Sequence, residues 1–312
     1  MGQDVEQRDV EAVAFVVNPM SGGGGGDQLF LNIARMLRSR GVWVAAFETH
    51  RRQGARPAVE AALRAGFEEI WVIGGDGTIR ECLKPILEAD AILGPIPGGT
   101  SNRLVEVVGH AWTDPLSQAE WMLGQPVRRM DLGECNGELF TVRAGVGFEA
   151  EAAREVEDDK SGLGNFAYVV AGLRAARDIR RVPVRLLAGH ELLLEDEMLT
   201  AIFSNLPMRV LLRVPGLERA NPSDGVLHAI VIRDRPGVDV LWRWVTSWQE
   251  PPPEPKLVFE ATAAEFVLEV AGGAEVHLDG EGLGGQERVT VRCRPAALRL
   301  RGLDLAAGTP GG

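Results

Sequence analysis

The sequence predicts an α/β N-terminal domain with a parallel sheet, followed by an all-β, antiparallel second domain. Up to about residue 130, short apolar runs alternate with helical patterns, which is typical of parallel strands joined by helices on both faces of a sheet. Beyond Arg128, strand-length segments follow one another with turn residues between them, which indicates antiparallel pairing. The length of 312 residues supports two domains, because single cores usually stop growing near roughly 250 residues.

Apolar patterns place the individual elements. The four strands expected in the first region cover 12–17, 42–47, 69–73 and 91–96. An apolar face at helical spacing lies between the first two strands and ends at Gly41; its residues are Phe30, Ile33, Ala34 and Leu37. The strand segments expected in the second region are 138–148, 182–189, 190–205, 225–233, 256–273, 274–282 and 287–302. Two helical patterns, at 165–181 and 237–249, interrupt them.

Charge and cysteine content narrow the range of partners and compartments. The formal net charge of −11 argues against broad nucleic-acid binding and against general attraction to an anionic membrane surface. Cys82, Cys135 and Cys293 lie far apart without metal-site spacing, so neither a disulfide framework nor a zinc site is expected. The N-terminus is too polar for a signal sequence, and no apolar run approaches the ~20 residues of a membrane span. We therefore expect a cytoplasmic protein that binds no nucleic acid.

Three of the expected strands end in glycine-rich turns. Val17 leads into "NPMSGGGGG", Ile73 into "GGDGT" and Ile96 into "PGGTSN". Because the carboxyl ends of parallel strands meet at one edge of a sheet, these turns should form one site. Glycine allows close backbone approach, and helices expected to begin at Asp27, Thr78 and Ser101 would add positive ends, so the site suits phosphate groups. For the first turn, a flexible linker is an equal alternative. For Asp76, a turn in which its side chain caps the next helix is the less favoured alternative.

Four motifs in this order resemble the diacylglycerol kinase catalytic family, which includes sphingosine kinases and bacterial lipid kinases: "VVNPMSG", "VIGGDGTIRECL", "LGPIPGGTSN" and "LDGEG". The resemblance extends from about residue 12 to 300, and "GGDGT" alone is also similar to NAD kinases and phosphofructokinases. It implies a nucleotide-binding domain over 1–132, related in fold to those kinases. It also implies a mainly β, sandwich-like domain over 133–297 on the acceptor side of a cleft, and a tail from about 298 to 312 that returns to the first domain.

The resemblance also implies roles for individual residues. Asp279 matches the family's general base, and Glu281 would orient it or help to hold a metal, although an isolated Asp-Gly-Glu is more often a surface turn. Mg²⁺ would be held with the help of Asp76, Asp131 and Asp224, and for Asp224 a Ser-Asp-Gly turn is an equal alternative. The residues implied to bind ATP are Asn18, Ser21, Gly22, Gly74, Gly75, Asp76, Gly77, Thr78, Gly98, Gly99, Thr100 and Asn102.

Two departures from the family pattern keep alternatives open. Arg103 stands where the family commonly has an acidic residue of the metal network, and His228 stands where an acidic residue is common. The leading hypothesis is an ATP-dependent kinase for a hydroxyl of diacylglycerol or a related lipid. The alternatives are a kinase for NAD or another small molecule and a catalytically impaired module that binds a nucleotide or a lipid.

Basic and aromatic side chains in the two helical patterns add a prediction about partners. Arginines at 174, 177, 180 and 181 and tryptophans at 242, 244 and 248 predict transient, peripheral contact with the inner face of a membrane. Solvated arginines and tryptophans that cover the β core are the alternative, and the sequence favours it over membrane contact. A homodimer is also among the partners considered.

Overall fold

The computed structural model of the chain describes residues 5–50, 52–99, 102–106, 114–147, 181–207, 216, 218–234 and 256–303. The chain divides into two compact units: Met1–Asp131 with Ala296–Gly312, and Leu132–Pro295. Two strands, β6 (Val127–Cys135) and β15 (Glu281–Arg301), run from one unit into the other. The helices predicted at 165–181 and 237–249 lie outside the described residues, apart from Arg181.

The first unit contains the predicted parallel sheet. Its strands, in spatial order, are β3 (Trp43–Glu48), β2 (Ala12–Val17), β4 (Glu69–Gly74) and β5 (Ile92–Pro97). The end of β15 adds a further parallel strand next to β5, with Arg299 opposite Ile92. A two-residue strand, β1 (Val5–Glu6), pairs with the beginning of β6. All six residues of β4 are buried, because this strand has a neighbour on each side and helices on both faces.

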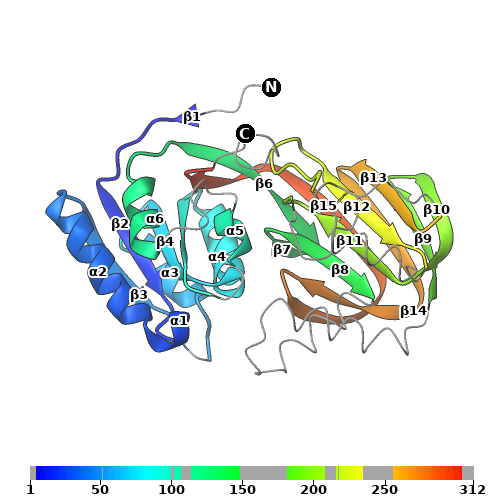
Figure 1. Ribbon diagram of the computed structural model, residues 1–312, viewed down its shortest axis with the longest axis horizontal. Helices are drawn as coiled ribbons and strands as arrows, with labels where there is room; N and C mark the ends of the chain where they lie inside the picture. The colour runs from blue at the N-terminus through cyan, green and yellow to red at the C-terminus, as the bar shows by residue number, and fades with distance from the viewer. Residues whose placement is uncertain are drawn as a thin grey trace. The chain divides into compact units, whose positions relative to one another are not determined.

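Helices cover both faces of this sheet, as the alternating pattern predicts (Figure 1). The helices α2 (Gly26–Ser39) and α6 (Pro115–Met122) pack against each other on one face, and α3 (Arg56–Arg64) and α4 (Asp76–Glu88) do so on the other. On α2, Ile33, Ala34 and Leu37 are buried, and the ring of Phe30 packs edge-on against Phe15 of β2. Two short helical turns, α1 (Ser21–Gly24) and α5 (Arg103–Glu106), follow β2 and β5.

The order of the strands creates a switch point beside β2. The chain passes from β2 to β3 on one side and then crosses back to β4 on the other side, so the connections after β2 and after β4 leave in opposite directions. In open α/β sheets, ligands bind outside the carboxyl ends of the strands at such a point. The turns that begin at Asn18 and Gly75 lie there.

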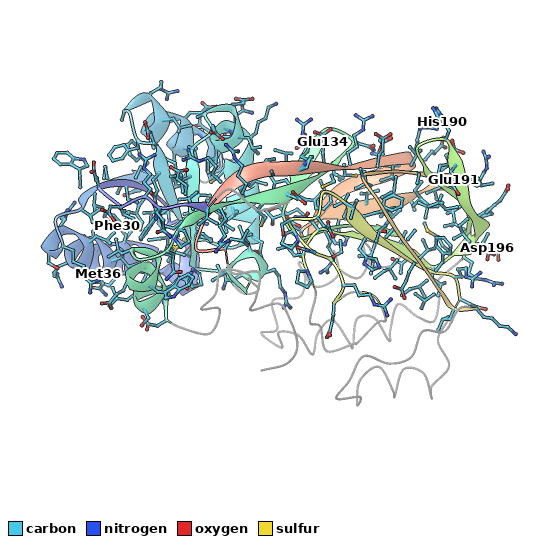
Figure 2. All side chains as sticks on the ribbon, turned by 90° about the horizontal axis from the view of Figure 1, so that it is seen from above. Phe30, Met36, Glu134, His190, Glu191 and Asp196 are labelled. Carbon is cyan, nitrogen blue, oxygen red and sulfur yellow. The ribbon has the colours of Figure 1, made fainter. Side chains whose placement is uncertain are left out.

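The second unit is all-β and antiparallel, as predicted. Its strands are the end of β6, β7 (Glu138–Phe140), β8 (Arg143–Gly147), β9 (Val182–Ala188), β10 (Glu191–Met198), β11 (Thr200–Ser204), β12 (Leu227–Ile232), β13 (Val258–Ala263), β14 (Glu265–Leu278) and most of β15. They surround one core of apolar side chains that includes Phe140, Phe203 and Phe266. Figure 2 shows His190, Glu191 and Asp196 on the outer hairpin β9–β10, whose edge strand carries four acidic residues. Charged side chains on an edge strand oppose pairing with other chains.

Several strands of this unit differ from the segments expected from the sequence. The segments 138–148, 190–205 and 256–273 each form two strands, namely β7 and β8, β10 and β11, and β13 and the first part of β14. The segments 256–273 and 274–282 were predicted to be separate, whereas β14 continues through Gly272 and Gly273, which have φ of 78° and 77°. Before these glycines β14 pairs with β9, and after them it pairs with β8. The two positive-φ glycines form a bulge that bends the strand from one partner to the next.

A buried ion pair connects two strands of the first unit, β15 and β4. The guanidinium group of Arg301, with no exposed surface, donates two hydrogen bonds to the carboxylate of Glu69 and further ones to the carbonyl oxygens of Arg8 and Gln125. The indole N–H of Trp71 donates to the same carboxylate. The last strand is thus tied to β4, 232 residues earlier in the sequence. Because both charges are buried, loss of either partner would leave the other uncompensated.

Gln118 on α6 yields a prediction about stability. Its side chain is fully buried, and among the described residues neither Nε2 nor Oε1 has a hydrogen-bond partner. An unpaired buried amide is costly, so Gln118→Leu should raise the free energy of unfolding by about 1–3 kcal/mol, measured by urea denaturation. Gln118→Glu, which puts a charge at the same place, should lower it. A Leu variant less stable than the wild type would show that the amide has a partner such as an internal water.

Candidate functional site

The first glycine turn is bound to the end of β4. The backbone N–H of Asn18 donates to the carbonyl oxygen of Ile73 over 3.1 Å, and the Ser21 hydroxyl donates to the same oxygen over 3.3 Å. The Asn18 side chain also donates to the hydroxyl of Thr78, in the first turn of α4, over 3.4 Å. These bonds join the turn after β2 to the turn after β4.

The glycine run is helical rather than an open loop. Residues 21–24, including Gly22, form α1, and α2 begins at Gly26 after a break at Gly25. A Cβ at Gly26 would lie 2.3 Å from the carbonyl oxygen of Asn18, so the chain can pass there only without a side chain. The glycine at this position is therefore required by a close backbone approach, and the flexible-linker alternative does not explain it.

The third turn lies directly against the second. The N–H of Gly98 donates to the carbonyl oxygen of Gly74 over 3.1 Å. A Cβ at Gly99 would lie 2.5 Å from the Cα of Gly75, and one at Gly98 would lie 3.0 Å from the Cβ of Ser21 in the first turn. The three turns therefore contact one another at one edge of the sheet, as the sequence predicts. Asn102, at φ 49°, holds the third turn by bonds between its side chain and the backbone of Gly99; Thr100 and Ser101 lie outside the described residues.

Asp76 supports the third turn from the start of α4. Its carboxylate accepts hydrogen bonds from the backbone N–H groups of Arg103 and Leu104, over 3.1 and 3.3 Å, at the beginning of α5. The side chain is 9% exposed, and Gly77 follows it in the first helical turn. Asp76 therefore does cap a helix, but the helix is α5 and not α4, the helix that follows it in the sequence. The helix α4 begins at Asp76 itself, two residues before the expected start at Thr78.

The other two predicted metal ligands also accept backbone hydrogen bonds. Asp131, 3% exposed on β6, accepts a bond of 2.6 Å from the N–H of Ala296, a residue at φ 49°. Asp224 is exposed, and its carboxylate accepts a hydrogen bond from the backbone N–H of Val226. This bond is typical of the Ser-Asp-Gly turn that the sequence allows as an alternative. Within the described part of the chain, no three His, Cys, Asp or Glu side chains lie close enough together to hold a metal ion.

Asp279 lies in the tight hairpin between β14 and β15. With Gly280 it forms the two-residue turn, at φ 52° and 99°, and the flanking residues Leu278 and Glu281 pair with each other. Positive φ at both central positions is typical of a type I′ turn, for which Asp-Gly is a favoured pair. Asp279, which the family resemblance connects with catalysis, is therefore also suited to the backbone of this turn.

The carboxylate of Asp279 accepts four hydrogen bonds from one bend of the chain. Oδ2 accepts from the N–H and the hydroxyl of Thr141, over 2.7 and 2.9 Å, and Oδ1 accepts from the N–H groups of Val142 and Arg143, both over 2.9 Å. Successive N–H groups that converge in this way form an anion-binding concavity. The bend connects β7 with β8, and the side chain of Asn205 holds it by a bond to the carbonyl oxygen of Thr141.

The sequence did not indicate Thr141 or Asn205 as members of this cluster. Both are fully buried polar residues at strand ends. The segment 138–148 also contains the charged residues Glu138 and Arg143, so Thr141 does not stand out in the sequence. Gly133 on β6 has a packing role, because a Cβ there would overlap the ring of Phe140 at 1.9 Å.

His228 forms a second polar cluster in the same unit. Its Nε2 lies 3.4 Å from Oε2 of Glu260, which also accepts a bond of 2.9 Å from Arg219. Burial lowers the pKa of His228 below its usual value of 6.5; Glu260 and Asp224 oppose the shift, and Arg219 adds to it. The neutral form of the imidazole is therefore favoured.

Comparison with known proteins decides the family. The sequence-family model described as "Diacylglycerol kinase catalytic domain" matches residues 12–135. A Pseudomonas aeruginosa protein named "Probable lipid kinase YegS-like" is 31% identical over 264 residues, which cover 82% of each chain. The chain belongs to the diacylglycerol kinase family of lipid kinases. It is thus a member of a family of phosphotransferases.

Solved structures confirm the fold of this lipid kinase family member. The crystal structure of a diacylglycerol kinase from Bacillus anthracis matches with a TM-score of 0.71 at 18% identity, over 97% of this chain and 100% of that one. An NAD kinase from Archaeoglobus fulgidus in complex with ATP matches with a TM-score of 0.50 at 12% identity, over 95% of each chain. None of the described helices is both long and apolar enough to cross a membrane.

The buried His228 should make stability depend on pH. Because its folded pKa is lowered, its contribution to stability is present above the unfolded pKa of about 6.5 and is lost as the pH falls through the folded value. Between about pH 7.5 and 5, the wild type should lose stability faster than His228→Gln, by at most about 1.4 kcal/mol per pH unit. Urea unfolding across this range measures the difference.

The matched control is His190→Gln, because His190 is exposed on the outer hairpin of the same unit. This variant should keep the pH dependence of the wild type. Equal pH slopes for wild type and His228→Gln would contradict the assignment of a buried, neutral imidazole.

Proposed function

We propose that this family member is an ATP-dependent kinase that phosphorylates a hydroxyl group of diacylglycerol or a related lipid. The observation that carries the proposal is the mutual contact of the three glycine turns at the carboxyl edge of β2, β4 and β5. Together with the first turns of the long helices α2 and α4, they offer what a polyphosphate needs: backbone that a ligand can approach closely, and positive helix ends. The lipid acceptor follows from the family and from the names of the relatives.

Mg²⁺ belongs to the proposal as the counter-ion of the ATP phosphates. In such sites Mg²⁺ usually keeps several waters and binds through one or two carboxylates plus the substrate's phosphates. Asp76, Asp131 and Asp224 are the carboxylates proposed for this role. A carboxylate has about four lone-pair sites, so a backbone N–H bond does not by itself exclude an ion or its water. When bound, Mg²⁺ would neutralise charge that develops on the phosphoryl oxygens.

In the proposed step, the lipid hydroxyl oxygen forms a bond to the γ-phosphorus, and the bond from that phosphorus to the bridging oxygen breaks. ADP leaves with the electron pair, and the hydroxyl proton passes to the carboxylate of Asp279. Most analyses describe phosphoryl transfer by a loose transition state, in which positioning matters more than the strength of the base. A carboxylate that is fixed by four donors is well positioned for this task. Glu281, at the start of β15, is proposed to orient the acceptor or an ion.

A diacylglycerol-like acceptor resides in a bilayer, so the proposal includes transient contact with the inner face of a membrane. The second candidate function is a module that binds a nucleotide or a lipid without efficient transfer. The observation that favours it is the occupation of both Asp279 oxygens by two donors each, which also suits a purely structural carboxylate. An assay with γ-labelled ATP, Mg²⁺ and panels of lipids and NAD separates the lipid kinase from the small-molecule kinase and from this module.

The glycine contact predicts an effect on nucleotide affinity. In Gly99→Ala the new Cβ would overlap the Cα of Gly75 and force the second and third turns apart. The affinity for ATP, measured by titration calorimetry with Mg²⁺, should fall at least about tenfold, which corresponds to ~1.4 kcal/mol. Gly124→Ala is the matched control, because its Cβ would meet only the oxygen of Trp121 at 3.9 Å. Equal ATP affinity of the two variants would remove the turns from the nucleotide site.

The base assignment predicts a loss of phosphoryl transfer. Asp279→Asn should lower kcat about 10²- to 10⁴-fold, the usual contribution of a general base, while ATP still binds. Asp9→Asn, at an exposed position near the N-terminus, is the control for a lost surface charge. Circular dichroism confirms that each variant is folded. If Asp279→Asn keeps its rate and Glu281→Gln loses it, the base is Glu281.

A further inference from the structure

The four donors to Asp279 are of two kinds. Three are backbone N–H groups of consecutive residues, 141 to 143, whose directions are set by the bend between β7 and β8. The fourth is the hydroxyl group of Thr141, which donates to Oδ2 over 2.9 Å. A hydroxyl hydrogen rotates about its C–O bond, whereas a backbone N–H cannot turn without moving the chain. One of the four bonds is therefore exchangeable.

The surroundings of Thr141 keep its hydroxyl beside the carboxylate. The side chain has no exposed surface, and its carbonyl oxygen accepts a bond of 2.8 Å from the buried amide of Asn205. The N–H of Asn205 donates in turn to the carbonyl oxygen of Val142 over 2.9 Å. The bend is thus tied to the end of β11, so the hydroxyl stays within reach of Oδ2 in whichever direction its hydrogen points.

We propose that Thr141 is a positioning residue for the phosphoryl transfer assigned above, and this inference rests on that proposed function. To accept the proton of a substrate hydroxyl, the carboxylate needs a lone pair that is not already used. With two donors on each oxygen, the lone pair becomes available when the Thr141 hydroxyl turns away. The hydroxyl thus keeps the carboxylate oriented between turnovers, and when its hydrogen turns away, Oδ2 can accept the proton of the acceptor hydroxyl.

The proposal has a consequence that a merely structural threonine would not have. Thr141→Val keeps the shape and loses the hydroxyl, so kcat should fall while KM for ATP stays unchanged. Thr141→Ser restores a hydroxyl and should restore kcat.

The experiment is a kinetic double-mutant cycle of Thr141→Val and Asp279→Asn, assayed as transfer from γ-labelled ATP to diacylglycerol in mixed micelles. Alone, Thr141→Val should lower kcat about tenfold and leave KM for ATP unchanged. In the Asp279→Asn background it should change kcat less than about twofold, because a residue that acts through another has no effect once that residue is lost.

Thr200→Val is the matched control. Thr200 is also buried in the second unit, and its hydroxyl donates to the carbonyl oxygen of Val146 instead. This variant should be destabilised to a similar degree, as melting temperatures will show, and its effect on kcat should be additive with that of Asp279→Asn.

Two results overturn the inference, and they are distinguishable. Wild-type protein that transfers no phosphate to any lipid removes the proposed function and the inference with it. Active wild-type protein, in which the effects of Thr141→Val and Asp279→Asn on kcat are additive, removes the inference alone and leaves the kinase proposal intact.

Discussion

The parallel pairing of β4 with both β2 and β5 is the constraint on which the first unit depends. Val17 lies opposite Ile73, and Ile73 lies opposite Ile96, so the three strands end level with one another. The residues that follow must then turn at the same edge, within contact distance. Burial of the whole of β4 makes this register costly to change, because a shift of one residue would exchange the two faces of the strand.

Backbone approach explains the glycines at this edge better than flexibility does. Gly26 passes the carbonyl of Asn18, and Gly99 passes the Cα of Gly75, at distances that leave no room for a Cβ. The first of these glycines begins a regular helix. The same property that lets two backbones touch lets a ligand approach them, so packing and phosphate binding make the same demand on these positions.

Three of the aspartates to which the family resemblance assigns a role share a structural role. Asp76, Asp131 and Asp279 each accept backbone N–H groups from a segment distant in the sequence, and each is at least partly buried. A carboxylate that is fixed in this way fixes the turn that it binds and is itself held in place. Positioning is the larger part of what phosphoryl transfer asks of a protein, so anchoring and chemistry are compatible in one residue. Thr141 is distinct among these contacts because its donor can turn.

Local patterns in the sequence determined the element types, the parallel and antiparallel classes of the two units, and the edge at which the glycine turns gather. These features follow from hydrophobic period and from the rule that parallel strands end on one side. Tertiary structure alone decided that residues 21–24 are helical, that Asp76 caps α5, that β14 runs through its glycines, and that Thr141 and Asn205 belong to the Asp279 cluster. Each of these depends on a contact between segments far apart in the chain, and a contact of this kind leaves no periodic mark on either segment.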